Sequence, residues 1–455
     1  MSPSDAARSE PDAPPAPSAP PRSLGARLGR IGPGLIISAN IVGSGELIVT
    51  TQLGAQAGFV LLWFIVFSCF VKVFVQVELG RHTVAQGATT LEILDGLPGP
   101  RLVASWVVWL WLAMYVGTLF QISGMLGAIA ALFAPREAGA AHLAATVAPA
   151  ILCALILRRG RYGPVERAAT IMVAIFTLAT ITAVASLRWT PWSIGFAQIG
   201  EGLRFRMPES ATVAFAAFGV TGMGAAELIY YPYWCLEKGY ARFVGPPDGS
   251  PAWHERARGW IAVMQLDAWL SMVVYTVATL CFYLLGAAVL HARGELLTGA
   301  TLVPVLGGMY AEAFGPVGRQ GFLVGAFMVL FSTVFVSTAS NARLLADGAG
   351  LFRLLPNPSP ERRRRLMRQA CVGLPALSVL LYLLVAEPVL LVLMGAVAQA
   401  LMLPFIGLAA LHLRHRRTPP ELRPGPAWTA AVWAAVAAMT LLGVWQVASR
   451  LGVVG

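Results

Sequence analysis

The stretch IGPGLIISANIVGSGELIVTTQLGAQAGF, residues 31–59, decides the fold of this chain. Apolar residues run over positions 35–42, the sequence GSGE at 43–46 interrupts them, and apolar character resumes at Leu47. Glycine and serine hold a helix poorly, so the backbone can unwind at this point. Inside a bilayer, a carboxylate and free backbone groups are tolerated only where they face protein or a watery cavity. The stretch therefore predicts a membrane-crossing segment that is interrupted at a functional site.

The composition is that of a polytopic α-helical membrane protein. Of 455 residues, 57% are hydrophobic and 12% are charged, and the mean hydropathy is +0.69. A soluble protein would carry roughly twice this share of charged residues. The net charge of +11 does not indicate a nucleic-acid partner, because the arginines lie in short loops between apolar runs. The expected surroundings are the lipid bilayer.

Hydropathy predicts about eleven membrane spans, the first of them interrupted. Residues 1–23, rich in proline, alanine and serine, are expected to be a disordered cytoplasmic tail and not a signal peptide, which would need an apolar segment. After the first span, the expected spans lie near 60–84, 102–133, 142–157, 165–187, 209–236, 260–290, 320–345, 369–385, 388–412 and 427–448.

The basic residues predict the orientation of these spans. With the N-terminus inside, about 25 of the 33 basic residues fall on the inner side and about 7 outside. We therefore expect a multi-pass protein of a bacterial-type inner (plasma) membrane, with a cytoplasmic N-terminus and an external C-terminus.

The sixth span repeats the pattern of the first. GSGELI at 43–48 corresponds to GMGAAELI at 222–229, and each has a break of small residues followed by Glu-Leu-Ile. Five spans separate the two, so the two halves would have opposite orientations. Paired interrupted segments in inverted halves indicate a midplane site of a secondary transporter. We expect one five-span repeat over residues 24–190, another over 191–412, and an eleventh span within 413–455; chance similarity of small residues is the alternative.

Two carboxylates carry the predicted chemistry of these breaks. Glu46 and Glu227 each stand where a helix restarts, beside carbonyls freed at the break, near Val220 in the second one. Carboxylate and carbonyl oxygens suit a hard cation. Met223 could add a thioether that favours softer metals. We predict a substrate site at these four residues and Gly43, with Glu46, Met223 and Glu227 as metal ligands. Alternatively, each Glu pairs with a buried arginine or backbone amide and only holds the fold.

Glu92, after the second span, and Arg368, at the start of the ninth, are candidates for a proton path. A solvated loop carboxylate and a positive-inside arginine are the simpler explanations. Enzymatic motifs such as a P-loop, GxSxG or HExxH do not occur in the sequence. We expect no enzyme activity and no cofactor.

Several of these motifs resemble the NRAMP family of proton-coupled divalent-metal transporters. The similarity begins at Gly-Pro-Gly, 32–34, and continues through LGAQAGF, 53–59; it resumes at GATTLE, 87–92, and at Leu-Pro-Phe, 403–405. Arg368 resembles the arginine-bearing start of the family's ninth span. The resemblance implies an all-α, LeuT-type fold of eleven transmembrane helices with inverted five-helix repeats and broken first and sixth helices.

The sequence departs from the family where the metal would bind. The family's Asp-Pro-Gly-Asn motif reads Gly-Ser-Gly-Glu at 43–46, so its Asp is Gly43 and its Asn is Glu46. In the sixth span, Met-Pro-His reads Met-Gly-Ala at 223–225, which keeps the Met and loses the His. Glu92 retains one of two paired acids, and Arg368 one of two adjacent arginines.

We therefore hypothesise a monomeric secondary-active transporter of a divalent cation (Mn/Fe/Mg class), working by alternating access with proton coupling. A transporter of an organic or cationic solute with the same fold is the alternative, because small residues leave room at the centre. A non-transporting membrane sensor is a third reading, although the tail offers no recognised output domain.

Overall fold

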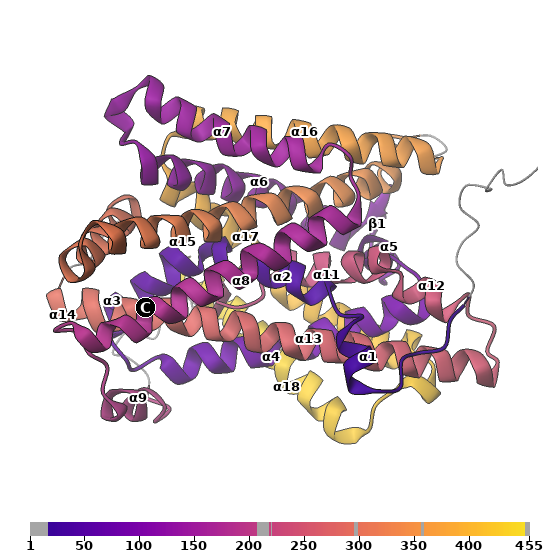
Figure 1. Ribbon diagram of the computed structural model, residues 1–455. Helices are drawn as coiled ribbons and strands as arrows, with labels where there is room; N and C mark the ends of the chain where they lie inside the picture. Colours follow the sequence, from indigo (N-terminus) through magenta and orange to yellow (C-terminus); the bar gives the residue numbers. More distant parts are fainter. Residues whose placement is uncertain (1–16, 207–217, 220, 295–298, 356–358, 451–455) are drawn as a thin grey trace, which may run out of the picture.

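The computed structural model describes residues 17–206, 218–219, 221–294, 299–355 and 359–450. The described chain is almost entirely helical, and its long helices form one bundle (Figure 1). Its helices are α1 (Leu24–Leu28), α2 (Pro33–Ile41), the π-helix η1 (Val42–Thr50), α3 (Thr51–Ala57), α4 (Leu62–Gln86), α5 (Thr90–Asp95), α6 (Trp106–Phe133), η2 (Arg136–Ala138), α7 (Ala140–Leu157), α8 (Tyr162–Ser186), η3 (Leu187–Trp189), α9 (Phe196–Gly202), α11 (Ala225–Lys238), α12 (Tyr240–Val244), α13 (Pro251–Leu285), the π-helix η4 (Gly286–Leu290), α14 (His291–Arg293), α15 (Gly299–Leu351), α16 (Pro360–Val385), α17 (Pro388–His412), the π-helix η5 (Leu413–Arg417), η6 (Pro420–Leu422) and α18 (Pro426–Arg450). A short antiparallel pair, β1 (Arg101–Leu102) and β2 (Ala104–Ser105), precedes α6.

Nine helices in the described part of the chain are each long and apolar enough to cross a membrane. The expected first span is not among them because it is divided into α2, η1 and α3; of the expected sixth span, 209–236, the structure describes 218–219 and 221–236. Most other boundaries lie within a few residues of the sequence prediction, but α13 begins at Pro251 and α16 at Pro360, before the expected starts at 260 and 369. Helix α15 begins at Gly299, well before the expected span, and turns sharply at Gly315, where φ is 65°.

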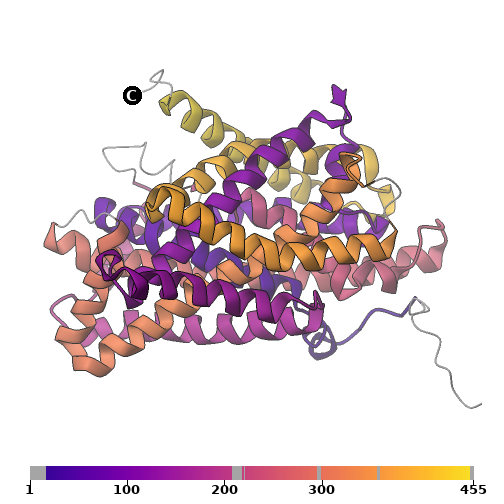
Figure 2. The same cartoon turned by 90° about the horizontal axis from the view of Figure 1, so that it is seen from above.

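Helices that hold the same place in the two halves of the chain pack against each other. The second and seventh (α4 and α13), the third and eighth (α6 and α15) and the fourth and ninth (α7 and α16) are each in contact. Figure 1 shows α7 and α16 side by side along one edge of the bundle. Seen from above in Figure 2, α18 follows the rim, in keeping with the small buried share of its apolar residues. This pairing is the one expected of two inverted repeats.

The interruption of the first segment takes a different form from the expected unwound coil. Residues Val42–Thr50 form a π-helix, so α2, η1 and α3 follow each other without an extended break. The wider turn of a π-helix interrupts the regular hydrogen bonding of an α-helix, and such turns are frequent at functional sites. The sixth segment is opened more fully, because Thr221–Gly224 lie outside any helix before α11 begins.

Candidate functional site at the two helix interruptions

Glu46 connects the two interruptions. Its side chain is fully buried within η1. Its carboxylate accepts a hydrogen bond from the Thr50 hydroxyl at 2.5 Å and another from the backbone N–H of Gly222 at 2.7 Å. Gly222 has a φ of 68°, and a Cβ atom there would press on the Cys69 sulfur, so only glycine lets this amide face the carboxylate easily. The acid of the first interruption therefore binds the backbone of the second.

Glu227 closes the start of α11 and reaches the first segment. It is buried, and its Oε2 accepts the backbone N–H of Gly224 at 3.0 Å, which satisfies one of the free amides of the helix start. Its Oε1 accepts a hydrogen bond from Asn40 Nδ2 at 2.6 Å. The pairing with a backbone amide that the structural alternative expects is therefore present for Glu227.

Asn40 is a site residue that the sequence analysis did not single out. Its side chain is buried in α2, where Ser337 donates to its Oδ1 at 2.7 Å while its amide donates to Glu227. The available signal was a single amide inside the apolar run 35–42. A buried amide is retained at little cost only when both ends are hydrogen-bonded, which here joins α2 to α11 and α15.

Gly43 lies where the first interruption packs closely against α15. A Cβ atom at this position would overlap the carbonyl oxygen of Val329 and the hydroxyl of Thr333, both in α15. Thr333 Oγ1 itself donates to the Asn40 carbonyl at 2.8 Å. The family's aspartate could not occupy this position without moving α15, so the loss of that residue and the tight helix contact go together.

Met223 is completely buried between Gly222 and Gly224, as expected of a residue in the second interruption. Val220, the other predicted site residue of this break, lies outside the described residues. Among those that are described, no group of three or more His, Cys, Asp or Glu side chains could hold a metal ion. A metal at this place would rest on two carboxylates, the thioether and backbone oxygens.

The side chain of Lys72, in α4, contacts the second interruption. It is the fully buried lysine of an apolar helix, and its Nζ donates to the carbonyl oxygens of Phe218 at 2.5 Å and Thr221 at 2.7 Å. The sequence analysis left it out of the site, although a lysine within an apolar run is itself a signal. The charges of Glu46 and Glu227 both act on this ammonium group.

A second amide pair supports the start of α11. Gln399 of α17 accepts the backbone N–H of Ala226 at 3.1 Å and donates to Gln121 of α6 at 2.8 Å. Both glutamines are buried, and neither was predicted as a site residue. The Ala226 amide at the start of α11 is thereby linked through Gln399 of α17 to Gln121 of α6.

Glu92 and Arg368 lie apart from this cluster. Glu92 is exposed at the start of α5, where its carboxylate accepts the backbone N–H of Thr89 at 2.8 Å in a capping box. It also lines a cavity of about 420 Å³ together with His82 and Arg417. Arg368 is exposed near the start of α16. Capping and surface solvation account for the two side chains in this conformation.

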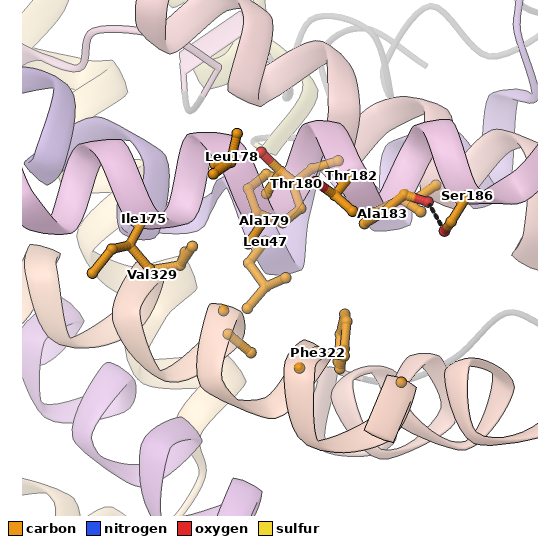
Figure 3. A pocket seen from close by; sticks show the side chains of 16 residues that line it. Leu47, Ile175, Leu178, Ala179, Thr180, Thr182, Ala183, Ser186, Phe322 and Val329 are labelled. Atoms are coloured by element: carbon orange, nitrogen blue, oxygen red, sulfur yellow. Dashed lines mark hydrogen bonds between the residues drawn. The ribbon is translucent and has the colours of Figure 1, made fainter. Parts of the chain in front are cut away.

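An apolar cavity of about 580 Å³ opens beside the first interruption. Figure 3 shows Leu47, the residue after Glu46, pointing into it between α8 and α15. Apart from Thr180, Thr182 and Ser186, its lining residues are apolar or glycine, and they include Phe282 and Phe322. Such a lining suits an apolar group and not a hydrated ion.

A helical membrane bundle with two interrupted segments and buried carboxylates at both defines the class of LeuT-type secondary transporters. Among solved structures, a point mutant of the Eremococcus coleocola manganese transporter matches with a TM-score of 0.64 and 16% identity, covering 96% of this chain and 91% of that one. Mhp1, a transporter of the nucleobase-cation-symport-1 family, matches with a TM-score of 0.52 and 13% identity, covering 96% of each chain.

Sequence comparison gives the family. The model of the Nramp family, described as natural resistance-associated macrophage protein-like, matches residues 34–449. The divalent metal cation transporter MntH of Yersinia enterocolitica is 25% identical over 306 residues, 65% of this chain and 69% of that protein. The chain belongs to the Nramp family, as the motifs had indicated.

Proposed function

We propose that this protein is a secondary-active transporter of a divalent cation of the Mn/Fe/Mg class, which it moves by alternating access. The observation that carries the proposal is the hydrogen bond from the Gly222 amide to Glu46, which joins the two interruptions at a buried carboxylate. The similarity to MntH of Yersinia and to the Eremococcus manganese transporter supports the choice of cargo. No catalytic role and no cofactor form part of this proposal.

The cation would be bound by Glu46, Glu227 and Met223, with backbone oxygens of the second break around Val220. In the described conformation both carboxylates are hydrogen-bonded within the protein. Binding would therefore exchange the Thr50 and Asn40 contacts for the metal. Because Asn40 lies in the first segment and Glu227 in the second, losing the bond between them alters the contact between the moving segments, as alternating access requires.

Proton coupling would run through Glu92 and Arg368. Glu92 supports this role because it is exposed and lines a cavity together with the ionisable side chains of His82 and Arg417. The two repeats, 24–190 and 191–412, would move against each other in a monomer. Orientation with the N-terminus in the cytoplasm and the C-terminus outside rests on the arginine distribution.

Uptake into proteoliposomes tests the function. We expect influx of Mn²⁺, Fe²⁺ or Mg²⁺ into vesicles that contain the wild-type protein, and background rates with Glu46→Gln, which keeps the shape of the side chain. Glu137→Gln, on the exposed turn η2, is the matched control and should transport normally. Equal background rates for the wild type and Glu46→Gln with every metal would end the metal hypothesis.

A second candidate function follows from the apolar cavity beside Leu47. Its size and lining would accept the apolar part of an organic or cationic solute. A thermal-shift screen separates the two functions. Stabilisation by an organic amine, lost in Ala183→Trp, which fills the cavity, with no stabilisation by any metal, would favour this candidate.

A further inference from the structure

We propose that Lys72 is a resident cation of the transport site and competes there with the substrate cation. Its ammonium group binds carbonyl oxygens of the second interruption. A substrate cation therefore has to displace the ammonium group before it can bind these oxygens. This inference deepens the proposed function, and it rests on that function only for the nature of the competing ion. Three observations lead to it.

The first observation is the position of the ammonium group. Carbonyls at the end of a half-helix lack partners within that helix, and they are the backbone oxygens that can bind a cation. Lys72 Nζ lies 2.5 Å from the carbonyl oxygen of Phe218 and 2.7 Å from that of Thr221, the residues that flank the undescribed position 220. Its ammonium also lies 4.6 Å from the centre of the Phe218 ring, a favourable cation–π distance.

The second observation is the way α4 supports this arrangement. Ser68, one turn before Lys72, donates to the carbonyls of Thr221 and Phe218 at 3.2 Å and 3.4 Å, and accepts from the Thr221 hydroxyl at 2.8 Å. Residues four apart share one face of a helix. The face of α4 that meets the second interruption is therefore built to hold these carbonyls around a positive charge.

The third observation concerns charge. Two buried carboxylates, Glu46 and Glu227, act on the ammonium of Lys72. A pair of buried carboxylates with no resident cation would leave the whole position to a substrate cation, whereas the lysine supplies a positive charge that repels a second cation nearby. Lysine holds a compact charge on a flexible stem, so it can withdraw when a metal arrives.

Composition sets this lysine apart. The chain has 33 basic residues, and Lys72 and Lys238 are its two lysines; the others are arginines. Lys238 pairs with Glu166 at 2.5 Å and is partly exposed.

One turn beyond Lys72, Gln76 is buried with both amide atoms lacking a hydrogen-bond partner among the described residues. That amide offers a displaced ammonium group an acceptor on the same helix face.

The first test is a calorimetric Mn²⁺ titration of the purified full-length protein. We expect Lys72→Met, which keeps the stem without the charge, to bind Mn²⁺ on the order of tenfold more tightly than the wild type. Lys72→Arg, which keeps the charge, should bind no more tightly, and Lys238→Met serves as the control. Should Lys72→Met not fold, Lys72→Gln replaces it. Unchanged or weaker binding by the uncharged variant would overturn the competition.

The second test does not depend on a metal. In Lys72→Ala, free propylammonium should fill the vacated position and raise the Tm, whereas neutral propanol should not, and the wild type should respond to neither. No rescue by propylammonium would overturn the assignment of this position. A further outcome is rescue of Lys72→Ala by propylammonium while neither the wild type nor Lys72→Met binds or transports any metal. That result would support Lys72 as a resident cation and contradict the proposed transport of a metal.

Discussion

The Asp267 carboxylate in α13 accepts the backbone N–H of Gly34 in α2 at 2.7 Å. Its other oxygen accepts the N–H of Gly32 at 2.8 Å, so one side chain satisfies two free amides at the start of the first segment. Gly34 packs so closely that a Cβ atom there would lie 2.8 Å from Ser271 Cβ. The N-terminal end of the interrupted segment is therefore fastened to α13, and its release would open that end of the bundle.

Replacing this carboxylate should free the start of α2. In Asp267→Ala the two amides lose their acceptor, and we expect faster hydrogen–deuterium exchange over residues 32–41, together with a lower Tm. Hydrogen bonds to charged groups contribute about 1.5–3 kcal/mol each, so the effect should be easily measured. Asp248→Ala, a fully exposed loop carboxylate, is the control. Unchanged exchange in Asp267→Ala would mean that packing alone holds α2.

Much of the fold could be predicted because hydropathy and residue spacing determine it locally. The spans, the two interruptions and the family followed from apolar runs and from motifs such as Gly-Pro-Gly at 32–34. The π-helical form of the first interruption could not be predicted, because glycine and serine at 43–45 indicate a weak helix but not which backbone hydrogen bonds replace the α-helical ones. The helix before Gly315 was missed for a related reason, since its sequence lacks a long apolar run.

The site was predicted less completely. Glu46 and Glu227 were found because carboxylates stand out in apolar sequence, and both are buried as expected. Asn40, which donates to Glu227, and Lys72 lie on other helices, and which helix face meets a break is decided by tertiary packing. Pairings such as Asn40 with Glu227, distant in the chain, have no local signature.

The pair Asn40 and Glu227 should be energetically coupled. Asn40→Ala leaves a buried carboxylate without its side-chain donor, and we expect a loss of about 1–3 kcal/mol in the free energy of unfolding. In a double-mutant cycle with Glu227→Ala, the two losses should not add, with a coupling of about 1 kcal/mol or more. Denaturation in detergent micelles measures this. Ser123→Ala, whose hydroxyl bonds within α6, should be additive with Glu227→Ala.

Gly43 should tolerate no side chain. Gly43→Ala places a methyl group against the Val329 carbonyl and the Thr333 hydroxyl, and overpacking of this kind costs about 1–3 kcal/mol. We expect a lower Tm and slower transport. The comparison is Gly163→Ala, where a Cβ atom would meet open space. A Gly43→Ala protein as stable as the wild type would show that α15 yields, and would allow the family's aspartate to be restored here.

A substitution at Glu92 can distinguish a role in proton coupling from a role in capping helix α5. A glutamine at the third position of a helix completes a capping box as well as a glutamate does, so Glu92→Gln should keep the hydrogen bond to Thr89 and leave the Tm unchanged. If Glu92 carries protons, the variant should retain metal uptake at equal pH on both sides but lose its stimulation by a pH gradient. Glu421→Gln, a half-exposed carboxylate beside His254, is the matched control and should respond to the gradient as the wild type does. Normal stimulation in Glu92→Gln would leave Glu92 a helix cap, because a neutral side chain cannot take up and release the coupled proton at this position.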